Sequence, residues 1–287
     1  MRYRAIPEHD RRDPIRLMCR PRPVSPAGYS AWAGRPESAR SVQNRTLRAA
    51  IRMIHRESRE PSGRPRIWDA LIKRGPRVGE QRLARLMRAD GIRAKTVKQW
   101  RATTDSGPPW PVATHALNRQ FQVAQPNWVW AGALTYVWPT EGWLDLAVVL
   151  DLYARLVIGW AMGHRLPVDL AERARTMALG KRPPTAGLLH HSDRGSPYAA
   201  PRSQRLLGEH GITPSMSRTG NCWDNACVER FFGTLTRELV SHRRDATRDA
   251  ATQDSFEHIE VFYNRTRRHA TRGDDSPAEC QARTAVA

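Results

Sequence analysis

The sequence predicts an α/β fold: a mixed five-stranded sheet with flanking helices, preceded by a basic helical region. In the second part of the chain, strand-like and helix-like segments follow as three strands, a helix, a strand, a helix, a strand and a long final helix. The charge is uneven, because residues 1–110 carry a net +16 and residues 111–287 only +3. A basic region joined to a nearly neutral one is typical of a nucleic-acid-binding part attached to a catalytic part.

The basic region is predicted to become helical after an irregular start. Residues 1–43 form a basic arm in which several prolines interrupt any helical period, so one short helix at most is expected there. Residues 44–102 form a helical region, since apolar residues recur every three or four positions in segments 44–59, 67–72 and 78–90. The four cysteines of the chain form no CxxC pair and predict neither a disulfide framework nor a zinc site.

The last two of these segments resemble a helix-turn-helix. Gly75-Pro76 breaks the chain between them, and the later segment is rich in arginine, as expected of a helix that lies on DNA. DNA contacts are expected from the basic side chains Arg82, Arg85, Arg88, Lys95 and Lys98. The surface of a plain helical bundle explains the pattern almost as well, and the charge asymmetry favours the DNA interpretation.

A polar linker at residues 103–119, rich in Gly and Pro, is expected to lead into an α/β core at residues 120–287. Strands are predicted at 128–137, 142–152, 155–162, 187–191 and 211–215, and helices at 168–179, 198–210 and from 224 onward. The four tryptophans Trp128, Trp130, Trp143 and Trp160 are expected inside this core, because large aromatic side chains tend to be buried there.

Two acidic residues of the core are the leading candidates for chemistry. Asp193 follows an apolar run that ends in HHSD, so it is expected at the tip of a buried strand. Glu229 lies on the last helix, whose N-cap is expected at Asp224 or Asn225, and falls off the apolar stripe of that helix. The 35 residues between the two acids leave room for one helix and one strand, so both carboxylates can converge.

Two converging carboxylates beside a basic surface suit Mg²⁺ or Mn²⁺, because these cations prefer oxygen ligands and keep water that a phosphate can displace. An isolated acid is more often a solvated surface charge. His190 and His191 could be metal ligands, but no further His or Cys completes a zinc-type set, and a positioning role near the substrate is favoured.

Three sequence words identify a family. HHSDRGSPYA, SMSRTGNCWDNACVERFFGTL and VFYNRTRRH, in this order, resemble the catalytic core of the insertion-sequence transposases of family three, the product of their second reading frame. These proteins belong to the DDE (Asp, Asp, Glu) transposase and retroviral integrase superfamily, which has a ribonuclease H-like fold. The resemblance runs from about residue 19 to residue 277, and includes Pro65-Arg66-Ile67 and an RLMR word at residues 85–88.

The resemblance implies a metal-dependent DNA strand cleavage and joining reaction. Asp193 and Glu229 would ligate two Mg²⁺ or Mn²⁺ ions together with a third carboxylate on the first strand of the core. The implied partners are double-stranded DNA, as terminal inverted repeats and target, a homo-oligomer of at least two chains on DNA, and the protein of the upstream reading frame. No membrane segment is visible, and a cytoplasmic, nucleoid-associated protein is expected.

The third carboxylate of the resemblance is missing. Family members carry an Asp in a W-x-x-D-x-T-Y word, whereas this chain has Trp130-Ala131-Gly132-Ala133-Leu134-Thr135-Tyr136. Three explanations stay open: a deliberate inactivating substitution, natural decay of an old element, or a substitute acid such as Asp145. We favour the first, because the other words are intact. Thr236 also departs from the family, which usually has Lys there, and Arg237 is expected to take over that contact.

Further phosphate contacts are expected around the core site. By position and by resemblance, the candidates are Arg194, Asn225, Arg237, Arg265, Arg267 and Arg268. Two other functions are compatible with the sequence: a non-catalytic DNA-binding remnant of a transposase, and a ribonuclease H-like nuclease that hydrolyses without joining.

Overall fold

The structure is a computed structural model, and it describes residues 15–19, 24–60, 62–94, 110–164, 167–219, 221–243 and 245–284. The chain divides into two compact units between Ile51 and Arg52. Among the described residues, no helix is both long and apolar enough to cross a membrane.

The first unit contains more helix than the prolines predict. α1 (Ile15–Cys19) and α2 (Pro26–Ala33) both lie in the arm, where one helix at most was expected. α2 forms because the Ser25 hydroxyl accepts from Gly28 N at 2.9 Å, and because the proline stands at the first helical position, where it costs no hydrogen bond. α3 (Ala39–Glu57) begins before residue 44, because the carbonyl and side chain of Ser38 cap its first turn.

The predicted helix pair of the basic region is present. α4 (Arg64–Lys73) buries Ile67 and Leu71, and α5 (Glu80–Ala89) buries Leu83, Leu86 and Met87. The turn between them is held because Trp68 Nε1 donates to Val78 O at 2.8 Å. The apolar stripe of α5 therefore faces inward and leaves its arginines on the other side.

The core sheet has the order β3-β2-β1-β4-β5. β1 (Val129–Val137), β2 (Leu144–Asp151) and β3 (Leu156–Gly163) pair antiparallel, while β4 (Leu189–Ser192) and β5 (Thr213–Met216) pair parallel beyond β1. All five predicted strands are present, with ends shifted by at most two residues. This mixed sheet with flanking helices is the ribonuclease H-like arrangement.

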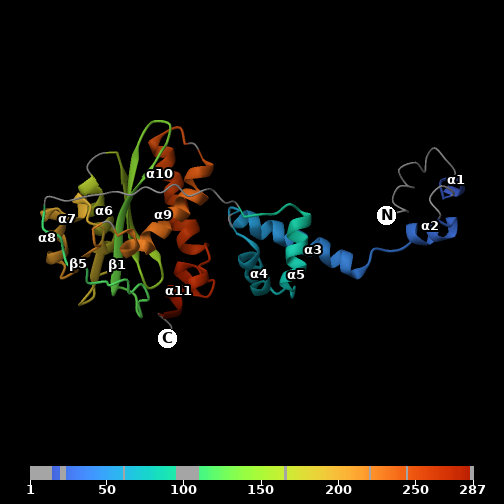
Figure 1. The fold of residues 1–287 in the computed structure, drawn as a ribbon, viewed down its shortest axis with the longest axis horizontal. Helices are drawn as coiled ribbons and strands as arrows, with labels where there is room; N and C mark the ends of the chain where they lie inside the picture. Colours follow the sequence, from blue (N-terminus) through green and yellow to red (C-terminus); the bar gives the residue numbers. More distant parts are fainter. Residues whose placement is uncertain are drawn as a thin grey trace. The chain divides into compact units, whose positions relative to one another are not determined.

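Helices cover both faces of the sheet (Figure 1). On one face, α6 (Pro167–Lys181) and α8 (Pro201–Glu209) pack on Trp130, Val149 and Ile158. On the other, α9 (Ala226–Glu238) and the helix formed by α10 (Arg248–Phe256) and the π-helical η3 (Glu257–Tyr263) enclose a second cluster around Phe231. The remaining short elements are α7 (Ser196–Ala199), η1 (Cys222–Asn225), η2 (Val240–His242), η4 (Ala270–Arg272) and α11 (Pro277–Thr284).

One helix prediction needs correction, and one is confirmed. The single helix expected at residues 198–210 is two, α7 and α8, because Ala200 is extended (ψ 138°) ahead of Pro201, and proline disfavours a helical residue before it. The final helix has its N-cap at one of the two expected residues, Asp224 or Asn225, which confirms that prediction. Its first turn is the 3₁₀ segment η1, and Asn225 occupies the N-cap of α9 without a capping side-chain hydrogen bond.

The tryptophan prediction is only partly right. Trp130 is fully buried and Trp160 half-buried, but Trp128 is 49% exposed and Trp143 57% exposed. Trp143 lies just past the β1–β2 turn, where it packs edge-to-face with Tyr136 and Trp138, both also exposed. Position in an apolar strand pattern therefore did not ensure burial.

Candidate active site

The parallel pairing of β1 with β4 places position 133 beside Asp193. The last bonded pair of this register is Gly132 with Ser192, so Ala133 and Asp193 are the next residues of the two strands. Ala133 is 4% exposed and belongs, like Ala131, to the apolar cluster that α9 covers. The side chain at 133 therefore points to the face of the sheet on which the Glu229 helix lies.

Asp193 is oriented by the backbone that follows it. Gly195 N donates to Asp193 Oδ1 at 2.9 Å. A Cβ atom at residue 195 would lie 2.9 Å from that same oxygen, so the glycine allows the close approach. Burial raises the pKa of Asp193 above its usual value, and the Gly195 hydrogen bond opposes this shift. Asp193 is thus a fixed and partly desolvated carboxyl group.

Glu229 approaches the same place from α9. Val228 and Phe231 are buried against the sheet, so the Glu229 side chain turns away from that core and is exposed. The start of the helix is tied to the sheet because Asn225 Nδ2 donates to Gly132 O at 3.2 Å. Desolvation raises the pKa of Glu229, and the charge of Asp193 raises it further. Glu229 therefore lies within electrostatic range of Asp193.

The structure thus brings together positions 133, 193 and 229, of which only the last two carry a carboxylate. Within the described part of the chain, no group of three or more His, Cys, Asp and Glu side chains is arranged to hold a metal. Asp145 does not substitute for the missing acid. It pairs with Tyr136, whereas Ala133 pairs with Val148, and its neighbours Leu144 and Leu146 face α9, so Asp145 points to the opposite face of the sheet.

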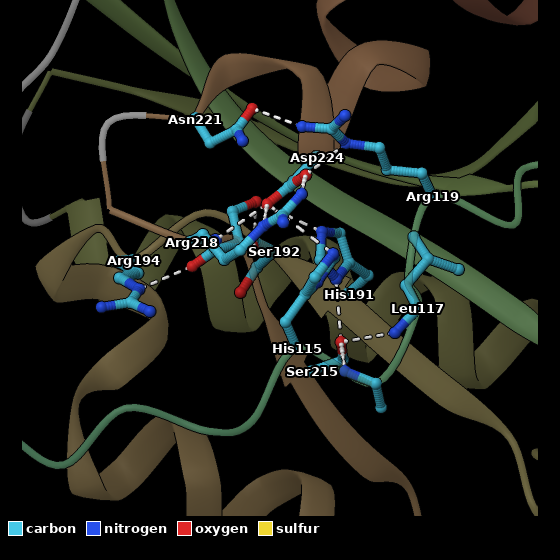
Figure 2. A network of polar contacts seen from close by, with 12 residues as sticks. His115, Leu117, Arg119, His191, Ser192, Arg194, Ser215, Arg218, Asn221 and Asp224 are labelled. Atoms are coloured by element: carbon cyan, nitrogen blue, oxygen red, sulfur yellow. Dashed lines mark hydrogen bonds and ion pairs between the residues drawn. The ribbon is translucent and has the colours of Figure 1, made fainter.

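A buried carboxylate that sequence reasoning missed organises the loop between β5 and α9. Asp224 is fully buried, and its carboxylate accepts from the backbone N and the guanidinium of Arg218 and from Arg119 Nε at 2.7 Å (Figure 2). These contacts, with the Arg218 side chain first, hold the pKa of Asp224 far below its usual range. Helix periodicity suggested only an N-cap here, and nothing in the sequence pairs residue 119 with residue 224.

The two histidines of the HHSD word are core residues, and the positioning role expected of them near the substrate stays a prediction. His191 is fully buried between Ser215 and Ser217, with ring-nitrogen to hydroxyl distances of 2.9 and 3.2 Å. Burial, then the neighbouring His115, lowers the pKa of His191 to about 4. His190 is buried on the other face of β4 beside Tyr198, and burial lowers its pKa well below the usual value.

Three of the predicted phosphate contacts are exposed. Arg85 and Arg88 lie on the outer side of α5, and Arg265 is exposed just after η3. Arg82 is half-buried on α5. Lys95 and Lys98 lie outside the described residues. The exposed arginines are the best-placed of the set for DNA, because they can reach phosphate without first leaving an internal partner.

The other predicted contacts are engaged within the protein. Arg194 donates to Ser217 O at 2.6 Å and to Thr219 Oγ1 at 2.7 Å, and Arg237 donates to Gly233 O at 2.8 Å. Asn225 is buried, and its amide donates to Gly132 O. This side chain therefore stabilises the candidate site from inside the protein and does not lie on a surface that DNA could contact.

The C-terminal arginines have acidic partners. Arg267 forms a two-pronged pair with Glu238, and both side chains are at most 10% exposed. Arg268 donates to Asp69 Oδ2 at 2.7 Å, and the Asp69 side chain also pairs with Lys73. A DNA contact by either arginine would need its intramolecular pair to open.

Comparison with known proteins assigns both parts of the chain. Residues 42–100 match a family model described as an HTH-like domain, and residues 123–222 and 210–277 match two models described as integrase core domains. Among solved structures, the chain is similar to a simian T-cell lymphotropic virus intasome (17% identity, TM-score 0.47, 74% of this chain and 69% of that one). It is also similar to the HTLV-2 integrase catalytic core domain in complex with magnesium (14%, TM-score 0.42, 56% and 99%).

Sequence relatives cover almost the entire chain. The chain is 43% identical over 261 residues to the "Insertion element IS600 uncharacterized 31 kDa protein" of Shigella sonnei. This alignment covers 91% of this chain and 96% of the relative. It is 35% identical over 281 residues to "Transposase InsF for insertion sequence IS3A" of Escherichia coli (strain K12), and this alignment covers 97% of this chain and 98% of the relative. With the sheet topology and the domain matches, these relatives show that the chain belongs to the IS3 family of insertion-sequence DNA transposases, with an HTH-like domain ahead of an integrase catalytic core.

Proposed function

We propose that this transposase cleaves and joins DNA strands at the ends of its own insertion sequence, with positions 133, 193 and 229 as its catalytic centre. The observation that carries the proposal is the β1–β4 register, which puts position 133 beside Asp193 on the side of the sheet that faces the Glu229 helix. The chain as it stands lacks the first carboxylate, and we expect it to be inactive for that reason.

Two of the three positions fit a divalent metal such as Mg²⁺ or Mn²⁺. Asp193 and Glu229 are oxygen donors whose raised pKa values have a shared cause in desolvation, and their mutual repulsion is relieved by a cation. The methyl group of Ala133 offers no donor, so metal affinity should be weak. When two such ions are bound, they activate the attacking oxygen and stabilise the leaving oxygen of a phosphodiester.

The protein's own contribution is to fix its carboxylates before the DNA arrives. The Gly195 N–H orients Asp193, and the Asn225 amide ties the start of α9 to Gly132, one residue from position 133. Held in this way, the carboxylates need little reorganisation to bind cations and substrate.

DNA binding is proposed to depend mainly on the basic helical region, because phosphate binding releases counterions in proportion to the cations involved. The predicted domain limits (1–43, 44–102, 103–119 and 120–287) remain part of this proposal. Two DNA ends must be held together, so assembly on terminal inverted repeats and target DNA is expected to involve at least two copies, and the protein of the upstream frame is a further candidate partner.

A second function is favoured by one observation, the alanine at position 133. A chain without the first acid can act as a DNA-binding protein that occupies element ends without cutting them. One experiment separates the two functions. Restoring an acid at position 133 restores DNA cleavage if the rest of the catalytic site is intact, but not if the protein has decayed at other positions as well. A ribonuclease H-like nuclease would cut without joining.

Restoring the acid with Ala133→Asp is expected to switch on cleavage and joining of labelled element-end duplex in the presence of Mg²⁺ or Mn²⁺. The new carboxylate would complete the ligand set beside Asp193. Adding Glu229→Gln should then reduce the rate by roughly a thousandfold or more, because the amide keeps the shape but loses the charge. Inactivity of Ala133→Asp with the upstream-frame protein present would favour the decayed remnant, and nicking without joined products would favour the nuclease. Activity of the double variant would exclude Glu229 as a ligand.

Asp193→Asn is expected to raise the melting temperature of the metal-free protein by a few degrees near pH 7. The pKa of Asp193 is raised on folding, so the unfolded state holds the carboxylate more readily and the charge destabilises the fold at neutral pH. Asparagine keeps an oxygen for Gly195 N and removes the repulsion with Glu229. The gain should disappear as the pH falls below the usual value of 3.8, where the carboxyl group is neutral in both states. Thermal unfolding across this range tests it; a lower melting temperature at pH 7 contradicts it.

Arg85→Ala with Arg88→Ala should weaken duplex binding and reduce the slope of log affinity against log salt by about two, one for each phosphate that is no longer neutralised. Arg173→Ala with Arg205→Ala, on the exposed sides of α6 and α8, removes the same charge from the core and is the matched control. Fluorescence anisotropy in a salt series measures both. Equal reductions in affinity in the two double variants would mean that overall charge, not α5, binds DNA.

A further inference from the structure

A strained turn lies just ahead of the first core strand. Asn118 and Arg119 both have positive φ (46° and 59°), and Gln120 N donates to Leu117 O at 2.9 Å, which is the pattern of a type I′ turn. Glycine and asparagine are the residues that accept such φ values readily. Arginine does so at a conformational cost, because its Cβ crowds the backbone. Arg119 therefore occupies a position that favours glycine.

The side chain of Arg119 gives a reason for this choice. Arg119 Nε donates to Asp224 Oδ1 at 2.7 Å, and Arg119 Nη2 donates to Asn221 Oδ1 at 2.9 Å (Figure 2). The planar guanidinium thus holds two residues of the loop between β5 and α9 in one fixed geometry, which a lysine could not reproduce. Strain at a defined position, together with an ionic contact that depends on it, points to a functional constraint.

The turn that carries Arg119 is attached to the core sheet. Leu117 is buried, and the backbone N–H groups of Ala116 and Leu117 both donate to Ser215 Oγ, at 3.0 and 3.2 Å. Ser215 belongs to β5, the strand from which the loop departs. Arg119 is therefore anchored beside one end of the loop and holds the other end, just before the helix α9 that carries Glu229.

We propose that Arg119 is a positioning residue of the catalytic centre, which holds Asn221 and Asp224 in the loop ahead of α9 and thereby fixes α9 and Glu229 relative to Asp193. The effect on catalysis rests on the proposed role of Glu229, whereas the effect on the loop does not. Arg119 is not a catalytic residue, because it touches neither of the two carboxylates of the centre.

Local contacts show why the role is positioning rather than folding. Arg218 already binds the Asp224 carboxylate through its backbone N–H and two guanidinium nitrogens, so the buried charge keeps a partner without Arg119. What Arg119 adds is a link to a segment 105 residues away in the sequence. Its removal should loosen the attachment of the loop and leave the loop itself and the core folded.

Hydrogen exchange of the full chain, without metal or DNA, tests the structural part. Arg119→Gly relieves the strained φ and removes the guanidinium, so the melting temperature should be unchanged or higher while amides in residues 217–229 exchange about tenfold faster, as expected when charge-assisted hydrogen bonds are absent. Asn118→Gly is the matched control, since it relaxes the same turn and keeps Arg119. Exchange in this segment should stay as in the unchanged chain. Equal exchange in the two variants would overturn the proposal.

A second measurement tests the consequence for catalysis. In the Ala133→Asp background, Arg119→Gly should lower the turnover rate with DNA affinity unchanged, Asn118→Gly should not, and Arg119→Lys should fall between, because lysine restores the charge but not the two-pronged contact. Weaker DNA affinity with normal turnover would instead make Arg119 a DNA contact and overturn the positioning role. If Ala133→Asp is itself inactive, the proposed function fails, and the exchange comparison still decides whether Arg119 holds the loop.

Discussion

The parallel pairing of β1 with β4 is the constraint on which the candidate site depends. Both strands are covered by helices on both faces, with Trp130 packed against α6 and Ala131 and Ala133 against α9. If the pairing shifted by one residue, every side chain of the strand would move to the opposite face of the sheet and meet the helices of the other layer. The packing of the core therefore determines the register. Positions 133 and 193 are neighbours because the hydrophobic core fixes them.

The third position depends on a different kind of interaction. α9 is held to the sheet by Phe231, which packs edge-to-face with Tyr263 at 4.7 Å between ring centroids, but its start is set by polar contacts of the preceding loop. Apolar packing tolerates small shifts of a helix, whereas buried ionic contacts with short distances do not. The structure thus combines a core-determined pair of positions with a carboxylate whose position is set by buried polar contacts.

Much of the fold and part of the candidate site could be predicted from the sequence alone. The five strands and Glu229 on a helix follow from apolar periodicity, which is local and strong in this chain. The limits of apolar periodicity appear at Ala200, where a proline divides a helix, and at Trp143, which lies in an apolar pattern but is 57% exposed. Burial depends on the neighbouring layer, and a single sequence does not reveal that layer.

The Asp224 cluster was beyond sequence reasoning for the same reason. Its partner Arg119 is separated by 105 residues and lies in a segment expected to be a linker. For the histidines of the HHSD word, a positioning role near the substrate was expected; their burial, with Ser215 and Ser217 as partners of His191 inside the fold, could not be predicted from the sequence. Long-range polar pairs carry no periodicity, so they appear only in the three-dimensional structure.

The central claim is that positions 133, 193 and 229 form one metal-binding centre completed by a single side chain. Anomalous X-ray diffraction from crystals of the Ala133→Asp chain with element-end DNA and Mn²⁺ tests it directly. The account predicts two manganese peaks between the three carboxylates, and none there in crystals of the unchanged chain. Manganese bound elsewhere, or equally strong peaks with Ala133 in place, would contradict it.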